Sequence, residues 1–141
     1  MKKIVLISLA FSLWASGVES LKLKAQLLDL LATFLNNGHK GALIYIDDPK
    51  YNGIINFLKQ SYLLDNCENA QIIFTKRYED LDPQCRNKKI FFLSFKEYRL
   101  HKNKAVGAFF WQKGRPNILF RKEALQKFHI KVTPEFEKFV E

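Results

Sequence analysis

The sequence predicts an α/β fold: a small sheet with a parallel βαβ core and an antiparallel C-terminal hairpin, with flanking helices. Continuous apolar runs at 42–46, 71–75 and 89–95 have the length and composition of buried parallel strands. Two further β-rich runs, 105–111 and 118–121, are close enough in the chain to form a hairpin. Helical or polar stretches separate the strands, which is typical of an α/β domain.

The chain begins with the pattern of a secretory signal peptide. Lys2 and Lys3 form a basic start, residues 4–15 are apolar, and small residues follow up to Gly17. We expect cleavage after Gly17, which leaves a single α/β domain at 18–141. The apolar run is shorter than the ~18 residues of a typical membrane span, so we expect no membrane insertion after cleavage. An uncleaved anchor is the alternative.

The composition is basic and well suited to a folded domain. Lysine and arginine number 23 against 14 aspartate and glutamate residues, and 48% of the residues are hydrophobic, which excludes a disordered chain. The basic residues form no long run and indicate a solvated basic surface. In an exported protein we expect no nucleic-acid partner.

The two cysteines, Cys67 and Cys85, favour a disulfide, because an even count in an oxidising compartment is usually paired. Each precedes a predicted strand by a few residues. If those strands are parallel, both cysteines lie at one edge of the sheet. Two reduced, buried cysteines are the alternative.

Two helices are predicted in the first half of the domain. Residues 20–36 repeat apolar side chains at spacings of three and four, with Ser20 as N-cap and a stop at 36–38. The stretch 54–63 also has a helical stripe. Between strands 42–46 and 71–75 it completes a βαβ unit, so the two strands should be parallel.

The C-terminal half is predicted from its turn and start signals. Residues 76–87 form a short polar linker, and 112–117 form the turn-rich loop of the hairpin. A short helix follows at 122–129, with Glu123 and Lys127 paired. The chain ends in a helix with Thr133 as cap and Pro134 in its first position, docked by Phe136, Phe139 and Val140.

No catalytic, cofactor-binding or metal-binding residues are predicted, and we expect no enzyme. His39, His101 and His129 lie in separate segments without ligand spacing. Ser61 and Ser94 lack the turn that exposes a nucleophile.

Asp47 and Asp48 follow the first strand, where open α/β sheets bind ligands. An Asp-Asp-Pro sequence before a helical stretch favours turn capping. A divalent cation held by the pair is the alternative.

The predicted hairpin is rich in aromatic residues. Strand alternation places Phe109 and Trp111 on one face and Phe110 on the other, so another element or a partner must cover each face. Aromatic and arginine side chains are typical interface anchors. Phe109, Trp111, Lys113 and Arg115 are therefore a hypothetical partner-binding surface, and core packing is the alternative.

The order of segments resembles the YfiR-like (YfiR/HmsC) periplasmic family. The resemblance lies in Asp47-Asp48-Pro49 with Gly53 after it, Cys85 before strand 90–95, and the closing hairpin with two helical segments after it. It implies an exported, disulfide-containing α/β protein that tends to form a homodimer. It also implies binding to the periplasmic part of an inner-membrane sensor, a diguanylate cyclase, which lowers cyclic-di-GMP output.

A small-molecule binding module is the alternative function. In that case a pocket should lie beyond Asp47, Thr75 or Ser94, at the ends of the predicted strands.

Overall fold

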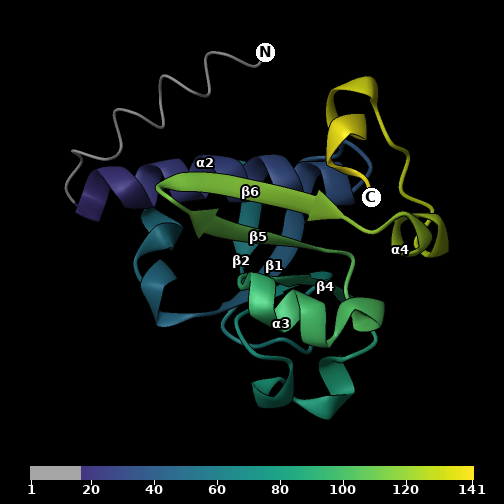
Figure 1. Ribbon diagram of the computed structural model, residues 1–141. Helices are drawn as coiled ribbons and strands as arrows, with labels where there is room; N and C mark the ends of the chain where they lie inside the picture. The colour runs from purple at the N-terminus through teal and green to yellow at the C-terminus, as the bar shows by residue number, and fades with distance from the viewer. Residues whose placement is uncertain (1–16) are drawn as a thin grey trace.

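The computed structural model describes residues 17–141, so the predicted signal peptide lies outside it except for Gly17. The fold is mixed α/β, and the predicted class is confirmed. A six-stranded sheet runs in the order β2-β1-β3-β4-β5-β6, parallel except for the antiparallel pair β5 and β6 (Figure 1). The main elements are α2 (Gly17–Leu35), β1 (Ala42–Asp47), β2 (Ser61–Leu63), β3 (Ile72–Thr75), β4 (Lys89–Phe92), α3 (Phe95–Leu100), β5 (Gly107–Gln112), β6 (Arg115–Phe120) and α4 (Lys122–Lys127).

The order of the parallel strands is that of a doubly wound sheet. The chain passes from β1 outward to β2 and then returns to the other side of β1 as β3. The strand order therefore reverses between β1 and β3. In open α/β sheets a ligand crevice forms at such a reversal, beyond the carboxyl ends of the strands.

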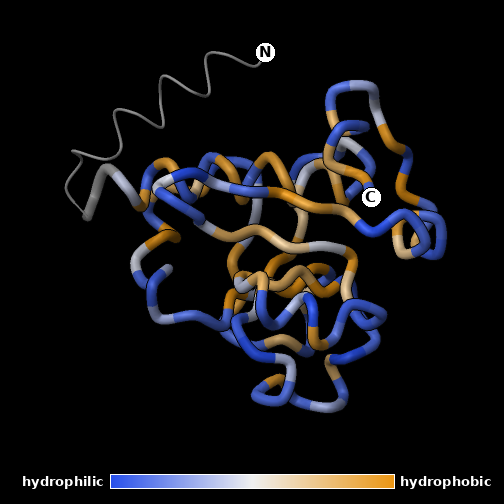
Figure 2. Tube along the Cα trace, viewed as in Figure 1, coloured by the Kyte–Doolittle hydropathy of each residue, from blue (hydrophilic) through white to orange (hydrophobic). Residues whose placement is uncertain are grey.

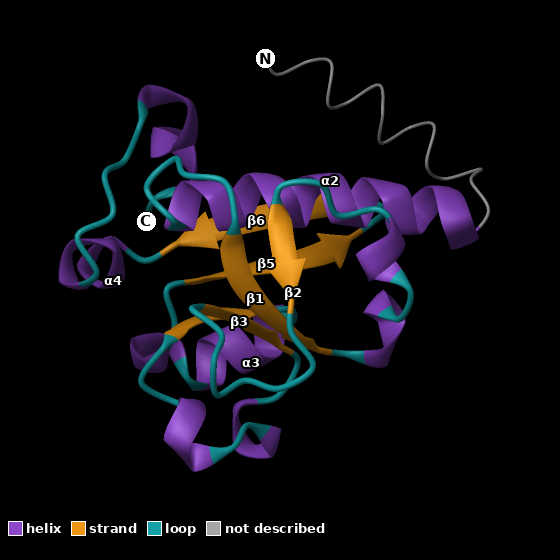
Figure 3. Ribbon diagram, turned by 180° about the vertical axis from the view of Figure 1, so that it is seen from behind, coloured by secondary structure: helices purple, strands orange, loops and turns teal. Residues whose placement is uncertain are grey.

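Each face of the sheet has its own hydrophobic core. Figures 1 and 3 place α2 on one side of the sheet and α3 on the other, and the central strands between them are largely hydrophobic in Figure 2. Alternate residues of β3 divide between the cores: Ile72 and Phe74 face α2, whereas Ile73 packs with Tyr98 of α3. Burial on both faces explains the continuous apolar runs.

Helix α2 ends where the sequence predicts but begins earlier. Asn37 and Gly38 have φ of 55° and 83°, and the Gly38 N–H donates to the Thr33 carbonyl at 2.8 Å. Ser20 is not the N-cap, because the helix already begins at Gly17.

The helix predicted at 54–63 is wrong. Two 3₁₀ turns, η1 (Pro49–Tyr51) and η2 (Ile54–Asn56), are followed there by edge strand β2. Gly53 separates the turns with a φ of 88°, and of the predicted stripe Ile55 and Tyr62 stay exposed. The extended segment instead gains backbone hydrogen bonds along β1, such as Leu64 N–H to the Ile44 carbonyl at 2.8 Å. The predicted parallel pairing of 42–46 with 71–75 is nevertheless confirmed.

Cys67 and Cys85 form a disulfide, with their Cα atoms 6.0 Å apart. They lie before the amino ends of β3 and β4, as the parallel arrangement predicts, and both are buried. The pairing is confirmed, and the alternative of two reduced cysteines is wrong.

The hairpin has a much shorter loop than predicted. Its turn is Lys113-Gly114, with φ of 54° and 77°, a left-handed pair that matches the twist of the two strands. Of the rest of the predicted loop, Gln112 belongs to β5 and Arg115 to Asn117 belong to β6. Pro116 is tolerated there because β6 is the edge strand.

The C-terminal segments are partly as predicted. Helix α4 is present, but Glu123 pairs with Arg121 (3.8 Å) rather than with Lys127. The last helix is a 3₁₀ helix, η6 (Pro134–Phe139), and Thr133 does not cap it through its side chain. Phe136 docks it in the core, and Val140 makes a parallel bridge to Phe120 beside β6.

Candidate ligand crevice

A cavity of about 360 Å³ lies at the carboxyl ends of the parallel strands. We call it the carboxyl-edge crevice. The segments after β1, β3 and β4 and the end of β5 line it, and Lys24 of α2 completes the wall. This is the position that the reversal of strand order between β1 and β3 favours for a ligand.

The three strand-end residues predicted beside a pocket have different positions. Ser94 lines the carboxyl-edge crevice, where its Oγ also accepts the Glu97 N–H at 3.3 Å and caps α3. Thr75 is fully buried, and the next residue, Lys76, lines the crevice instead. Asp47 borders a different cavity, together with Asp80.

Asp47 and Asp48 do not converge on a cation. Asp48 lines the crevice and accepts the Lys50 N–H at 3.0 Å, which is the capping role that the sequence favours. Asp47 does not line the crevice but borders the other cavity, which Asp80 also lines. Within residues 17–141 no three His, Cys, Asp or Glu side chains are grouped so that they could hold a metal ion.

Burial raises the pKa of the Asp47 carboxyl, and the nearby Asp80 and Asp48 raise it further. A raised pKa means that protonation favours the folded state, so the charged carboxylate destabilises the protein near neutral pH. We expect Asp47→Asn to raise the melting temperature at pH 7. The gain should shrink as the pH falls through the raised pKa of Asp47 toward the ordinary value of 3.8, because wild-type Asp47 is then increasingly protonated.

Thermal denaturation at several pH values measures this effect. The exposed Asp65→Asn is the control and should leave the melting temperature nearly unchanged. A lower melting temperature for Asp47→Asn at pH 7 would contradict the prediction.

Three lysines line the carboxyl-edge crevice: Lys24, Lys50 and Lys76. Lys24 is half-buried, and its Nζ lies 5.1 Å from the centre of the Tyr51 ring. Burial lowers the pKa of Lys24; Asp48 opposes this effect and Lys50 adds to it. In the described part of the chain none of the three makes a salt bridge.

Aromatic side chains also line the crevice. Phe110 and Trp111 line the crevice from β5, and the Phe95 ring packs 5.1 Å from that of Phe110. The Trp111 Nε1–H is buried and makes no hydrogen bond of ordinary geometry to residues 17–141, although the Tyr51 hydroxyl lies near it. The crevice therefore combines positive charge with an apolar surface.

The proposed partner-binding residues differ in their exposure: Phe109 and Trp111 pack in the core, whereas Lys113 and Arg115 are exposed. Phe109 is fully buried, so its assignment to a partner-binding surface is wrong, and the core alternative holds for it. The predicted alternation is confirmed, because Phe109 and Trp111 pack in the core under α2 and Phe110 packs on the α3 side. Lys113 and Arg115 are exposed at the hairpin turn, beside the crevice.

Two parts of the crevice were not predicted from the sequence. The strand predicted at 89–95 ends at Phe92, and its last residue, Phe95, begins helix α3, which was not predicted. Ser94 and Glu97 have the spacing of a capping signal that could have indicated this helix. The lysines come from three distant segments, and no local pattern connects them.

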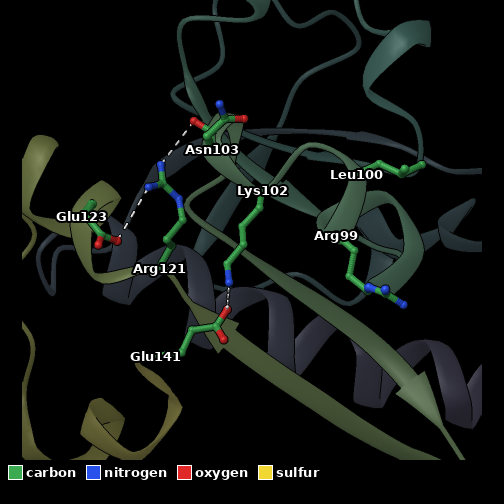
Figure 4. A pocket seen from close by; sticks show the side chains of 7 residues that line it. All are labelled: Arg99, Leu100, Lys102, Asn103, Arg121, Glu123 and Glu141. Atoms are coloured by element: carbon green, nitrogen blue, oxygen red, sulfur yellow. Dashed lines mark hydrogen bonds and ion pairs between the residues drawn. The ribbon is translucent and has the colours of Figure 1, made fainter.

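A second cavity, of about 500 Å³, is lined by three basic residues, Arg99, Lys102 and Arg121, and the last two are paired with acidic side chains (Figure 4). Lys102 lies 3.6 Å from Glu141, and Arg121 lies 3.8 Å from Glu123. An Arg121 Nη also donates to the Asn103 carbonyl at 3.3 Å. Because these charges are compensated within the chain, this cavity is a weaker candidate than the carboxyl-edge crevice.

Comparison with family models, with curated proteins and with solved structures gives no match to this chain. None of the helices in residues 17–141 is long and apolar enough to cross a membrane.

Proposed function

We propose that this chain is a non-catalytic binding protein of the bacterial envelope, and that it holds a small molecule in the carboxyl-edge crevice. The observation that carries the proposal is the position of the crevice. It lies beyond the carboxyl ends of β1, β3 and β4, beside the point where the strand order reverses. Its volume of about 360 Å³ suits a small ligand.

Two features support a location outside the cytosol. The Cys67–Cys85 disulfide is typical of oxidising compartments such as the periplasm. The basic and apolar start of the chain has the pattern of an export signal.

Thermal denaturation tests the proposed function. A small-molecule extract of the bacterial envelope should raise the melting temperature, because a ligand that binds only the folded state stabilises it. Gln112→Phe, which narrows the crevice, should remove that rise. Gln126→Phe, exposed on α4, should keep it. An equal rise in both variants would place the ligand elsewhere.

A second candidate function is regulation of an inner-membrane sensor, such as a diguanylate cyclase, through its periplasmic part. The position of Lys113 and Arg115 favours it, because these exposed residues immediately follow Trp111 and Gln112 of the crevice. A partner bound at the turn would cover the crevice and respond to its occupancy.

Cross-linking in the envelope tests the second candidate. The double variant Lys113→Ala, Arg115→Ala should lose most of the captured sensor, whereas Lys122→Ala, Lys127→Ala on α4 removes the same charge and should retain it. Equal capture by the two variants would exclude the hairpin turn as the docking site.

A further inference from the structure

We infer that the ligand of the carboxyl-edge crevice is a small organic phosphate. This inference rests on the proposed function and names the chemistry that the crevice recognises. Three lysines and the aromatic residues Phe110 and Trp111 line the same cavity, so the site offers a ligand both positive charge and apolar surface.

The fold brings the positive charges together. Lys24 comes from α2, Lys50 from η1, and Lys76 follows β3. Among the described residues that line the crevice, Asp48 is the only acidic one, and its Oδ1 already accepts the Lys50 N–H at 3.0 Å. The cluster therefore has a net positive charge that an anion can neutralise.

Neutralisation should be favourable here because the charges lack partners. The described residues provide no salt bridge to Lys24, Lys50 or Lys76. Lys24 is also half-buried, where mutual repulsion is screened less than in bulk water. A bound dianion would relieve this repulsion.

The charge of the cluster favours phosphate over carboxylate. A phosphate monoester carries up to two negative charges near neutral pH and a carboxylate carries one, so phosphate neutralises more of the lysine cluster. Lysine binds phosphate as a point charge with three donors. Phe110 and Trp111 give the organic part of the ligand a surface to contact.

Trp111 provides a direct measurement of binding. The sequence contains two tryptophans, and Trp14 lies in the predicted signal peptide, so the mature chain expected after cleavage has Trp111, which lines the crevice, as its single tryptophan. If the start of the chain is retained, Trp14→Phe gives the same single-tryptophan protein. In that background, phenyl phosphate should change Trp111 fluorescence saturably at constant ionic strength, and inorganic phosphate should compete. Benzoate and neutral benzyl alcohol should bind at least about tenfold more weakly.

A charge-matched pair of triple variants locates the site. Lys24→Gln, Lys50→Gln, Lys76→Gln should weaken phenyl phosphate binding by at least about tenfold. Lys104→Gln, Lys122→Gln, Lys131→Gln changes the net charge equally at exposed positions and should bind as before. An unchanged melting temperature in the absence of ligand shows that each triple variant is folded.

Three outcomes would overturn the inference: no saturable phenyl phosphate signal, equal affinities of the two triple variants, or binding of benzoate or benzyl alcohol as tight as that of phenyl phosphate. If the envelope extract still stabilises the protein and Gln112→Phe still removes that effect, the proposed function stands and only the phosphate assignment fails.

Discussion

Replacing Phe120 with alanine is expected to lower the free energy of unfolding by about 3–5 kcal/mol. Phe120 is fully buried at the end of β6. Its ring centre lies 4.7 Å from that of Phe34 in α2, 5.6 Å from that of Phe91 in β4 and 5.9 Å from that of Phe136 in η6. The substitution leaves a cavity where the sheet, the long helix and the C-terminal segment meet. Urea denaturation measures the loss.

Phe95→Ala is the matched control for Phe120→Ala. Phe95 is 41% exposed as a residue, so its replacement removes less buried apolar surface and the loss should be much smaller. A loss below about 1 kcal/mol for Phe120→Ala would contradict the packing described for this cluster.

The double variant Cys67→Ala, Cys85→Ala is expected to lose about 3 kcal/mol of stability. The bond closes a loop between residues 18 positions apart and therefore restricts the unfolded chain. Denaturant unfolding measures the effect. Wild-type protein in a reducing agent should show a similar loss, because the same constraint is removed.

Thiol labelling provides an independent check of the disulfide. Unfolded, unreduced protein should contain no reactive thiol, and reduction should release two. Two labelled thiols before reduction would refute the bond in the isolated protein.

The central strands could be predicted because a strand that is buried on both faces has a continuous run of apolar residues in the sequence. Residues 72–75 are all buried, so β3 has an unbroken apolar sequence. Edge strand β2 has no such signal: Tyr62 is exposed, and the strand exists because Ser61 to Leu63 pair with β1, a distant segment. The apolar residues in 54–63 are spaced as in a helix, and the only local signal against a helix is Gly53 just before them.

The site was predictable in position but not in charge. Parallel strands bring their carboxyl ends to one edge of the sheet, so a pocket was predicted there, and Ser94 does line the crevice. The convergence of Lys24, Lys50 and Lys76 depends on how α2 lies across the sheet and could not be read from spacing. Phe109 was misplaced because alternation gives the face of a strand but does not say which element covers it.

The margins of the sheet restrict how copies of the protein can associate. β2 spans only Ser61–Leu63. At the opposite margin Pro116 lacks an N–H, and the bridge from Val140 occupies the end of β6. Neither margin is a long template for recruiting a foreign strand, so we expect the protein to resist fibrillar aggregation at high concentration. A homodimer, which the family resemblance implies, should then assemble through side-chain contacts rather than through a continuous intermolecular sheet.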